Sequence, residues 1–260
     1  MQNLRTYGSR PFSVVVVHGG PGAAGEMAPV ARELAHEHGV LEPLQTATSV
    51  TGQIEELRGV LEEHADVPVT LIGYSWGAWL SSLCAAYYPA LVKKLILISS
   101  GPFEEQYAAG IQETRLGRLN EDERREIEAM MHAMKDPDVS DKDALLARFG
   151  RLFAKADAYD PVTLESDAVA IRWDVHSRVW KEAAQWRSSG KLLALAGQIA
   201  CPVLALHGDH DPHPAAGVQR PLANALRDFR FLLLPDCGHK PWIERRAADV
   251  FYRALKDALR

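Results

Sequence analysis

Short runs of β-branched and aliphatic residues, separated by longer amphipathic segments, constrain the fold of this chain more than any other feature. The clearest runs lie at residues 12–17, 69–72, 95–99, 203–206 and 229–234, with a weaker one around 39–44. Continuous apolar runs without alternation are typical of parallel strands that are buried on both faces. Because helical patterns lie between them, the sequence predicts an α/β fold with a mostly parallel central sheet flanked by helices.

The strand pattern breaks between about residues 101 and 199, where only helical patterns occur. Capping residues precede apolar residues at helical spacing here, as expected for helix starts. The capping residues are Asn120 with Glu123, Ser140 with Asp143, and Ser166 before a helix carrying Val169, Trp173, His176 and Trp180. We therefore expect an all-helical cap at 101–199, inserted into a core formed by 1–100 and 200–260 and closed by a helix over 241–259.

Composition excludes several classes of function. The 260 residues are 47% hydrophobic and 24% charged with a net charge of −5, which gives no electrostatic reason to expect nucleic acid or an anionic membrane as a partner. The chain start lacks the apolar stretch of a signal peptide, and the run at 14–17 is too short to span a bilayer. Three cysteines, an odd number, favour reduced thiols. We expect a cytoplasmic monomer or homodimer that acts on a small molecule.

Ser75 is the candidate nucleophile. It lies in the pentapeptide Gly73-Tyr74-Ser75-Trp76-Gly77, directly after one predicted strand and before a helical run. A strand that turns sharply into a helix leaves no room for side chains at the flanking glycines, and it lifts the serine hydroxyl above the edge of the sheet. Taken alone, the pattern also fits a serine that only caps a helix.

A serine hydroxyl needs a base, and the base needs a carboxylate that orients it. His239 follows the last predicted strand and precedes the last predicted helix, so it lies at the same edge of the sheet as Ser75. Asp209 and Asp211 both follow the strand at 203–206. We favour Asp211 because it lies further from the strand end, and we expect Asp209 to brace the turn.

The segment His-Gly-Gly-Pro-Gly at 18–22 follows the first long strand and can aim a backbone amide at a developing oxyanion. We expect the amides of Gly20 and Trp76 to form that oxyanion hole. The chain order is then oxyanion loop, serine, aspartate and histidine. This order is the one expected when each group follows a different strand of an α/β-hydrolase sheet.

These motifs resemble the α/β-hydrolase fold superfamily over nearly the whole chain: HGGPG at 18–22, GYSWG at 73–77, HGDHD at 207–211 and CGH at 237–239. HGGPG together with Ser-Trp-Gly resembles the branch that contains proline iminopeptidases. Those peptidases usually have a longer lead-in and a glycine where this chain has Tyr74, so we expect the opening strands to be shortened or absent. The resemblance also implies cap carboxylates that hold a substrate amine, for which the candidates are Glu104, Glu105, Asp174 and Glu182.

The sequence thus predicts a serine hydrolase that forms an acyl-enzyme at Ser75 on a small ester, amide or related carbonyl compound. A prolyl aminopeptidase, a lyase that retains the triad and a ligand-binding protein are the alternatives. Tyr74, Trp173 and Trp180 are candidate pocket residues. Side chains of the kinds that bind divalent metals occur close together at His207, Asp209, His210, Asp211 and His213. Because this loop already supplies the carboxylate of the triad, we expect no metal and no cofactor.

Overall fold

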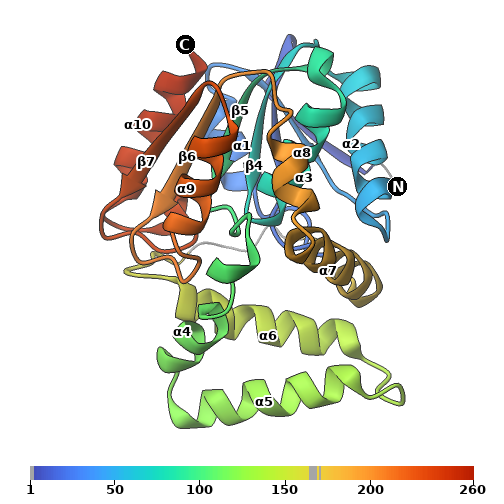
Figure 1. The fold of residues 1–260 in the computed structure, drawn as a ribbon, viewed down its shortest axis with the longest axis vertical. Helices are drawn as coiled ribbons and strands as arrows, with labels where there is room; N and C mark the ends of the chain where they lie inside the picture. Colours follow the sequence, from blue (N-terminus) through green and yellow to red (C-terminus); the bar gives the residue numbers. More distant parts are fainter. Residues whose placement is uncertain (1–2, 164–168, 170) are drawn as a thin grey trace.

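The computed structural model describes residues 3–163, 169 and 171–260 (Figure 1). They form a seven-stranded sheet in the order β1-β3-β2-β4-β5-β6-β7. Every neighbouring pair is parallel except β1 and β3, so the predicted α/β fold with a mostly parallel sheet is confirmed. The strands are β1 (Leu4–Tyr7), β2 (Phe12–Val17), β3 (Gly39–Pro43), β4 (Val69–Tyr74), β5 (Val92–Ile98), β6 (Val203–Gly208) and β7 (Phe229–Leu234).

Helices cover both faces of the sheet, and this explains why the strands are apolar without alternation. In β2, Val15 and Val17 pack toward one layer, whereas Val14 and Val16 pack toward the other. The first layer holds α2 (Val50–His64), α3 (Trp76–Tyr87), α8 (Lys191–Ala196) and α9 (Ala216–Ala225). The second layer holds α1 (Ala28–Leu34) and α10 (Ala248–Leu259).

Where the structure describes it, the segment between β5 and β6 consists mainly of helices, with an isolated β-bridge at Pro161. Its longer helices are α4 (Ile111–Gly117), α5 (Glu121–Lys135), α6 (Lys142–Asp157) and α7 (Trp173–Ser188), followed by α8. Figure 1 shows α5 and α6 side by side below the sheet, and they share a hydrophobic cluster of their own. Apolar residues of α7 and α8 instead belong to the core cluster of α2 and α3. The division into a cap at 101–199 and a core stays a prediction.

Of the three predicted helix starts, Asn120 caps α5 together with Glu123 as expected, and the other two fall elsewhere. The cap of α6 is Asp141, which accepts the N–H of Ala144 at 3.0 Å, so Ser140 is not the cap. Asp143 accepts the N–H of Trp173 at 2.7 Å instead. Helix α7 begins only at Trp173, after Val169, because the extended backbone of Arg172 donates its N–H to Gly22. Ser166 lies outside the described residues.

The prediction of one continuous helix over 241–259 is wrong. Pro241–Ile243 forms one 3-10 turn, and α10 begins at Ala248. Glu244 separates the two because its extended backbone pairs with Pro161 in an antiparallel bridge. Among the described residues, none of the helices combines the length and the apolar character needed to cross a membrane.

Candidate active site

The sharp turn between β4 and α3 holds Ser75. Its backbone has φ of 51° and ψ of −113°, a strained conformation for a residue other than glycine. A Cβ on Gly73 would lie 2.2 Å from the carbonyl oxygen of Gly77, and a Cβ on Gly77 would lie 2.3 Å from that of Val17. Both glycines are therefore required by close backbone approach, as the sequence predicted.

The structure brings Ser75, His239 and Asp211 together from three loops. The Nε2 atom of His239 lies 3.1 Å from Ser75 Oγ, and its Nδ1 atom lies 2.7 Å from Asp211 Oδ2. His239 and Asp211 are buried. Asp209 does not point to the histidine: its carboxylate accepts the N–H of Cys237 at 3.1 Å and so braces the loop that carries His239.

Asp211 is held as an anion. Burial acts to raise the pKa of its carboxyl, but His239, His213 and His207 together outweigh burial and hold that pKa well below its ordinary value. A carboxylate that stays ionised accepts the Nδ1–H of His239. This hydrogen bond leaves Nε2 unprotonated and directed at the Ser75 hydroxyl, which is the tautomer that a general base requires.

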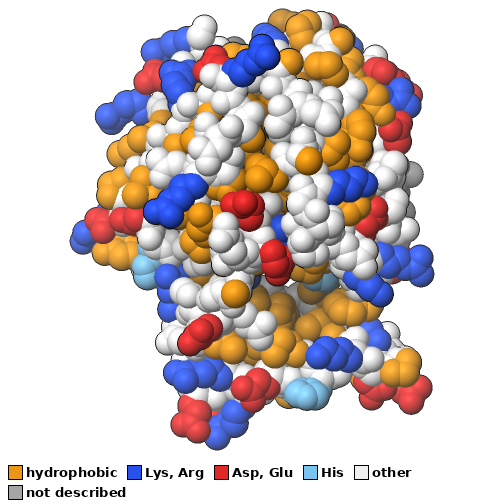
Figure 2. Space-filling model, viewed as in Figure 1, with side chains coloured by type: hydrophobic (Ala, Val, Ile, Leu, Met, Phe, Trp, Pro, Cys, Tyr) orange, Lys and Arg blue, Asp and Glu red, His pale blue; other side chains and the backbone are white. Residues whose placement is uncertain are grey.

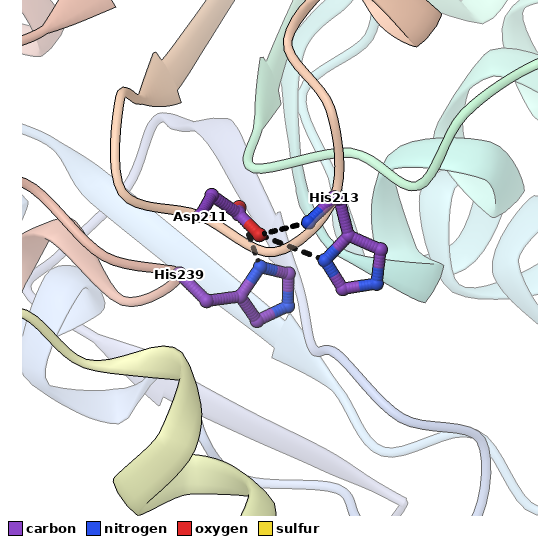
Figure 3. Close-up of side chains that lie close together, drawn as sticks. All are labelled: Asp211, His213 and His239. Atoms are coloured by element: carbon purple, nitrogen blue, oxygen red, sulfur yellow. Dashed lines mark hydrogen bonds and ion pairs between the residues drawn. The ribbon is translucent and has the colours of Figure 1, made fainter. Parts of the chain in front are cut away.

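Two further histidines, His213 and His207, lie beside Asp211, and Figure 3 shows the first of them. His213 Nδ1 lies 2.8 Å from Asp211 Oδ1, and His207 Nε2 lies 3.6 Å from Asp211 Oδ2. Burial lowers the pKa of His213 to about 4, so its imidazole is neutral near pH 7. The sequence pattern indicated these residues only as candidate metal ligands. The available signal was their position, since His207 lies in β6 four residues before Asp211 and His213 lies two residues after it.

The loop after β2 lies against the start of α3. Because Gly77 has no side chain, the carbonyl oxygens of Val17 and His18 approach it closely. This approach places the loop that carries Gly20 next to the N-terminus of α3, where Trp76 is the first residue. The Trp76 indole is buried and donates to Gln53 at 2.9 Å, so only its backbone faces the site. An oxyanion hole of Gly20 and Trp76 stays a prediction.

Tyr74 lies behind the base rather than open to solvent. Its ring is 2% exposed, with its centroid 5.1 Å from that of His239 and 4.7 Å from that of Trp242. Burial raises the pKa of its hydroxyl well above the ordinary value. Tyr74 thus buttresses the His239 imidazole from the side of the second helix layer.

Trp173 and Trp180 belong to a row of stacked rings along α7. The centroids of Trp173 and His176 are 6.0 Å apart, those of His176 and Trp180 are 6.3 Å apart, and Trp180 stacks on Trp79 at 5.8 Å. His176 Nδ1 lies 3.1 Å from the carbonyl oxygen of Pro21, so the row adjoins the loop of Gly20. Figure 2 shows the surface hollowed between α5–α6 and the rest of the molecule, with hydrophobic side chains along the hollow.

The four candidate cap carboxylates have partners elsewhere. Glu105 pairs with Arg187 at 2.8 Å and Asp174 with Arg172 at 2.8 Å. Glu182 accepts the N–H of Val50, and Glu104 accepts the side-chain amide N–H of Gln106 at 3.3 Å. In the part of the chain that the structure describes, none of these contacts joins a carboxylate to Ser75, His239 or Asp211.

The carboxylate of Glu244 and the backbone carbonyl of Asp157 hold the loop of the base, and neither was predicted from the sequence. Glu244 accepts the N–H groups of Gly238 at 2.9 Å, Tyr159 at 2.9 Å and Asp160 at 2.8 Å. The carbonyl oxygen of Asp157 accepts the N–H of His239 at 2.9 Å. The loop that carries the base is therefore fastened to the chain leaving α6.

The cluster of predicted metal-type residues divides in space. Among the described residues, Asp211, His213 and His239 form a group whose candidate ligand atoms all lie within 4.8 Å of one another, and His207 Nε2 lies 3.6 Å from Asp211 Oδ2. His210 instead places its ring 5.2 Å from that of Tyr159. The nitrogen and oxygen atoms of the group are 2.7 Å and 2.8 Å apart, which are N–H···O hydrogen-bond distances, so hydrogen bonding accounts for the group.

Comparison with known proteins places this site in a family. A family model described as the alpha/beta hydrolase fold matches residues 48–245. The chain is 25% identical, over 98% of its length and 97% of the relative, to a pimeloyl-[acyl-carrier protein] methyl ester esterase of Chromobacterium violaceum. Among solved structures, it resembles VinJ with a TM-score of 0.70 and 19% identity, covering 98% of this chain and 93% of VinJ. It also resembles proline iminopeptidase of Mycobacterium smegmatis with a TM-score of 0.61 and 16% identity, covering 98% and 93%. The chain belongs to the α/β-hydrolase fold family.

Proposed function

We propose that this protein is a serine hydrolase that cleaves carboxylic esters through an acyl-enzyme at Ser75. The observation that carries the proposal is the unbroken pair of hydrogen bonds from Ser75 Oγ through His239 to Asp211, at 3.1 Å and 2.7 Å. A nucleophile within hydrogen-bond reach of a base, which is itself oriented by a carboxylate, is the arrangement that acyl transfer requires.

In the first half-reaction, His239 Nε2 takes the Ser75 proton while Oγ bonds to the ester carbonyl carbon. The backbone amides of Gly20 and Trp76 donate to the oxyanion that forms. The bond between the carbonyl carbon and the alkoxy oxygen then breaks, and His239 gives its proton to the departing alcohol. Asp211 stabilises the imidazolium throughout.

The second half-reaction releases the acid. A water molecule gives a proton to His239 Nε2 while its oxygen bonds to the acyl carbon. The tetrahedral intermediate collapses, the bond to Ser75 Oγ breaks, and Oγ regains the proton from His239. The products are one alcohol and one carboxylic acid, and the enzyme is restored.

Two observations favour an ester over a prolyl amide. The curated relative in Chromobacterium violaceum is named a methyl ester esterase and matches nearly the whole chain. Three of the four cap carboxylates that would hold a free amine, Glu105, Asp174 and Glu182, are engaged by Arg187, Arg172 and the backbone of Val50. The prolyl aminopeptidase is the second candidate, favoured by HGGPG at 18–22 together with Ser75-Trp76-Gly77.

The test compares the wild type with Ser75→Ala on a panel of methyl esters, p-nitrophenyl esters and proline-arylamide, together with labelling by a fluorophosphonate. We expect ester turnover and labelling in the wild type and loss of both in Ser75→Ala. Ser188→Ala, which removes an exposed hydroxyl on α7, is the matched control and should keep both. Full turnover in Ser75→Ala would refute the proposal. A strong preference for proline-arylamide would favour the peptidase, and release of two products without water incorporation would favour a lyase.

A further inference from the structure

We propose that His213 is a positioning residue of the triad, which fixes the Asp211 carboxylate by donating to the oxygen that His239 does not use. The inference rests on the proposed role of Ser75, His239 and Asp211. The two carboxylate oxygens are divided between two imidazoles. Oδ2 lies 2.7 Å from His239 Nδ1, and Oδ1 lies 2.8 Å from His213 Nδ1 (Figure 3).

The backbone of the same residue strengthens the hold on Oδ1. The N–H of His213 donates to Asp211 Oδ1 at 2.9 Å, so this oxygen accepts two hydrogen bonds from one residue. A carboxylate that is tied at one oxygen by two donors has no freedom to rotate about its Cβ–Cγ bond. Oδ2 must then face His239, whose orientation toward Ser75 depends on it.

His213 is itself held in place. Its carbonyl oxygen lies 2.8 Å from His207 Nε2, and His207 is 1% exposed in the core below the loop. The ring of His213 lies against that of His239 with centroids 4.5 Å apart. Both rings and the carboxylate between them are buried, so solvent does not compete for these hydrogen bonds.

The charge state of His213 suits this role. The groups that face it are Asp211, His239 and, from α4, the guanidinium of Arg115. Burial is the largest cause that lowers its pKa to about 4, and Arg115 acts in the same direction. The imidazole is therefore a neutral donor near pH 7. A second positive charge beside His239 would oppose formation of the imidazolium during the reaction.

A donor on Oδ1 also lowers the basicity of the pair. It draws negative charge away from the oxygen that faces His239, so the carboxylate stabilises the imidazolium less than an unpaired one would. Removal of the donor should then have two separable effects. The carboxylate loses its orientation, which lowers kcat, and the negative charge that faces His239 changes, which displaces the pH profile of kcat/KM.

The test uses three variants at this one position and measures kcat, KM and the pH profile of kcat/KM on an ester of the panel above. His213→Phe keeps the ring and removes the donor. His213→Asn places an amide N–H near the position of Nδ1, and His213→Gln places it near the position of Nε2, out of reach of Oδ1. Asn and Gln are both polar and uncharged, so they form a matched pair.

We expect His213→Phe and His213→Gln to lose roughly 10- to 100-fold in kcat with little change in KM, because a hydrogen bond to a charged group is lost. The pH profile of kcat/KM should also be displaced relative to that of the wild type. His213→Asn should keep kcat within about threefold of the wild type. If His213→Phe does not fold, the comparison of Asn with Gln decides the question.

Equal activity of the Asn and Gln variants would overturn the proposal. So would equal losses in Phe, Asn and Gln with an unshifted pH profile and a lower melting temperature, since that result indicates packing alone. Failure of the underlying proposal is seen separately, because Ser75→Ala would then retain turnover while His213 is intact.

Discussion

Replacing Glu244 by alanine should remove the hydrogen bonds that connect the loop of His239 to the chain that follows α6. The Glu244 side chain is buried and accepts three backbone N–H groups, those of Gly238, Tyr159 and Asp160. Each buried donor left without an acceptor costs about 1–3 kcal/mol. The sum is an upper bound, since removing a buried carboxylate also relieves its desolvation and water can enter the space. We expect a net loss of about 3–5 kcal/mol of the free energy of unfolding.

The assay is urea unfolding followed by tryptophan fluorescence, with the free energy taken by linear extrapolation. Labelling by a fluorophosphonate is measured in parallel at low urea. We expect the rate of labelling to fall roughly tenfold or more, because His239 loses part of the support of its backbone. Glu244→Gln keeps the shape but turns an amide donor toward a backbone donor, so it should lie between alanine and the wild type.

Glu63→Ala on α2 is the matched control, because the Glu63 side chain is 75% exposed and its carboxylate lies 3.7 Å from the imidazole of His64. This substitution should change the free energy of unfolding by no more than about 0.5 kcal/mol. A loss below about 1 kcal/mol in Glu244→Ala, at an unchanged dependence on urea, would refute the reasoning. The hydrogen bonds of Glu244 would then contribute no more than those of an exposed side chain.

Three further predictions concern the turn, the pH dependence and metal. Gly77→Ala should lower the free energy of unfolding in urea by about 3 kcal/mol or more, because the new Cβ would lie 2.3 Å from the Val17 carbonyl oxygen. Gly150→Ala is the control on α6, where a Cβ meets open space, and it should raise the free energy of unfolding by about 0.5–1 kcal/mol. The pKa of His213 is about 4 in the folded protein and ordinarily 6.5, so the unfolded chain binds this proton first as the pH falls, and the folded state is destabilised. Between pH 7 and pH 5, the free energy of unfolding measured in urea should therefore fall by about 2 kcal/mol more in the wild type than in His213→Asn. Dialysis against EDTA should leave ester turnover unchanged, and a loss that zinc restores would contradict the hydrogen-bonded reading of Asp211, His213 and His239.

The central sheet could be predicted from the sequence because its inner strands are buried on both faces. Burial of that kind leaves a continuous apolar run, such as Val14 to Val17 in β2, and the shortness and β-branched residues of the run favour a strand. Strand β1 lacks the signal. It is an edge strand of four residues, Leu-Arg-Thr-Tyr, that pairs antiparallel with β3 and buries only Leu4. Register with a partner strand, not composition, determines such an edge.

The three triad residues could be predicted from the sequence because of the topology of the sheet. In a parallel sheet the carboxyl ends of β4, β6 and β7 meet at one edge, so residues just after each strand come together although they are far apart in the chain. The glycines at 73, 77 and 238 mark the tight turns there, since each has backbone atoms within 2.3 Å of where a Cβ would lie. Position along the chain, together with turn chemistry, was sufficient to select Ser75 and His239.

Glu244 could not be found in this way because its partners Tyr159 and Asp160 lie more than eighty residues earlier in the chain. Nothing near Glu244 in the sequence distinguishes a buried carboxylate from one on the surface of a closing helix. The predicted helix over 241–259 failed for the same reason. The side chain of Glu244 is directed by backbone donors of a different segment, and its own backbone bridges Pro161 instead of entering α10.

The three triad residues are anchored in different parts of the fold. Asp211 follows β6 and Ser75 follows β4, so both are anchored in the sheet. His239 is also fastened on its other side, where the Asp157 carbonyl oxygen and the Glu244 carboxylate join its loop to the end of α6. A displacement of α6 therefore acts on the base more directly than on the nucleophile or the acid. Since His239 Nε2 is 3.1 Å from Ser75 Oγ, a shift of about 1 Å would break that hydrogen bond, which makes the position of α6 a determinant of whether the base can reach the serine.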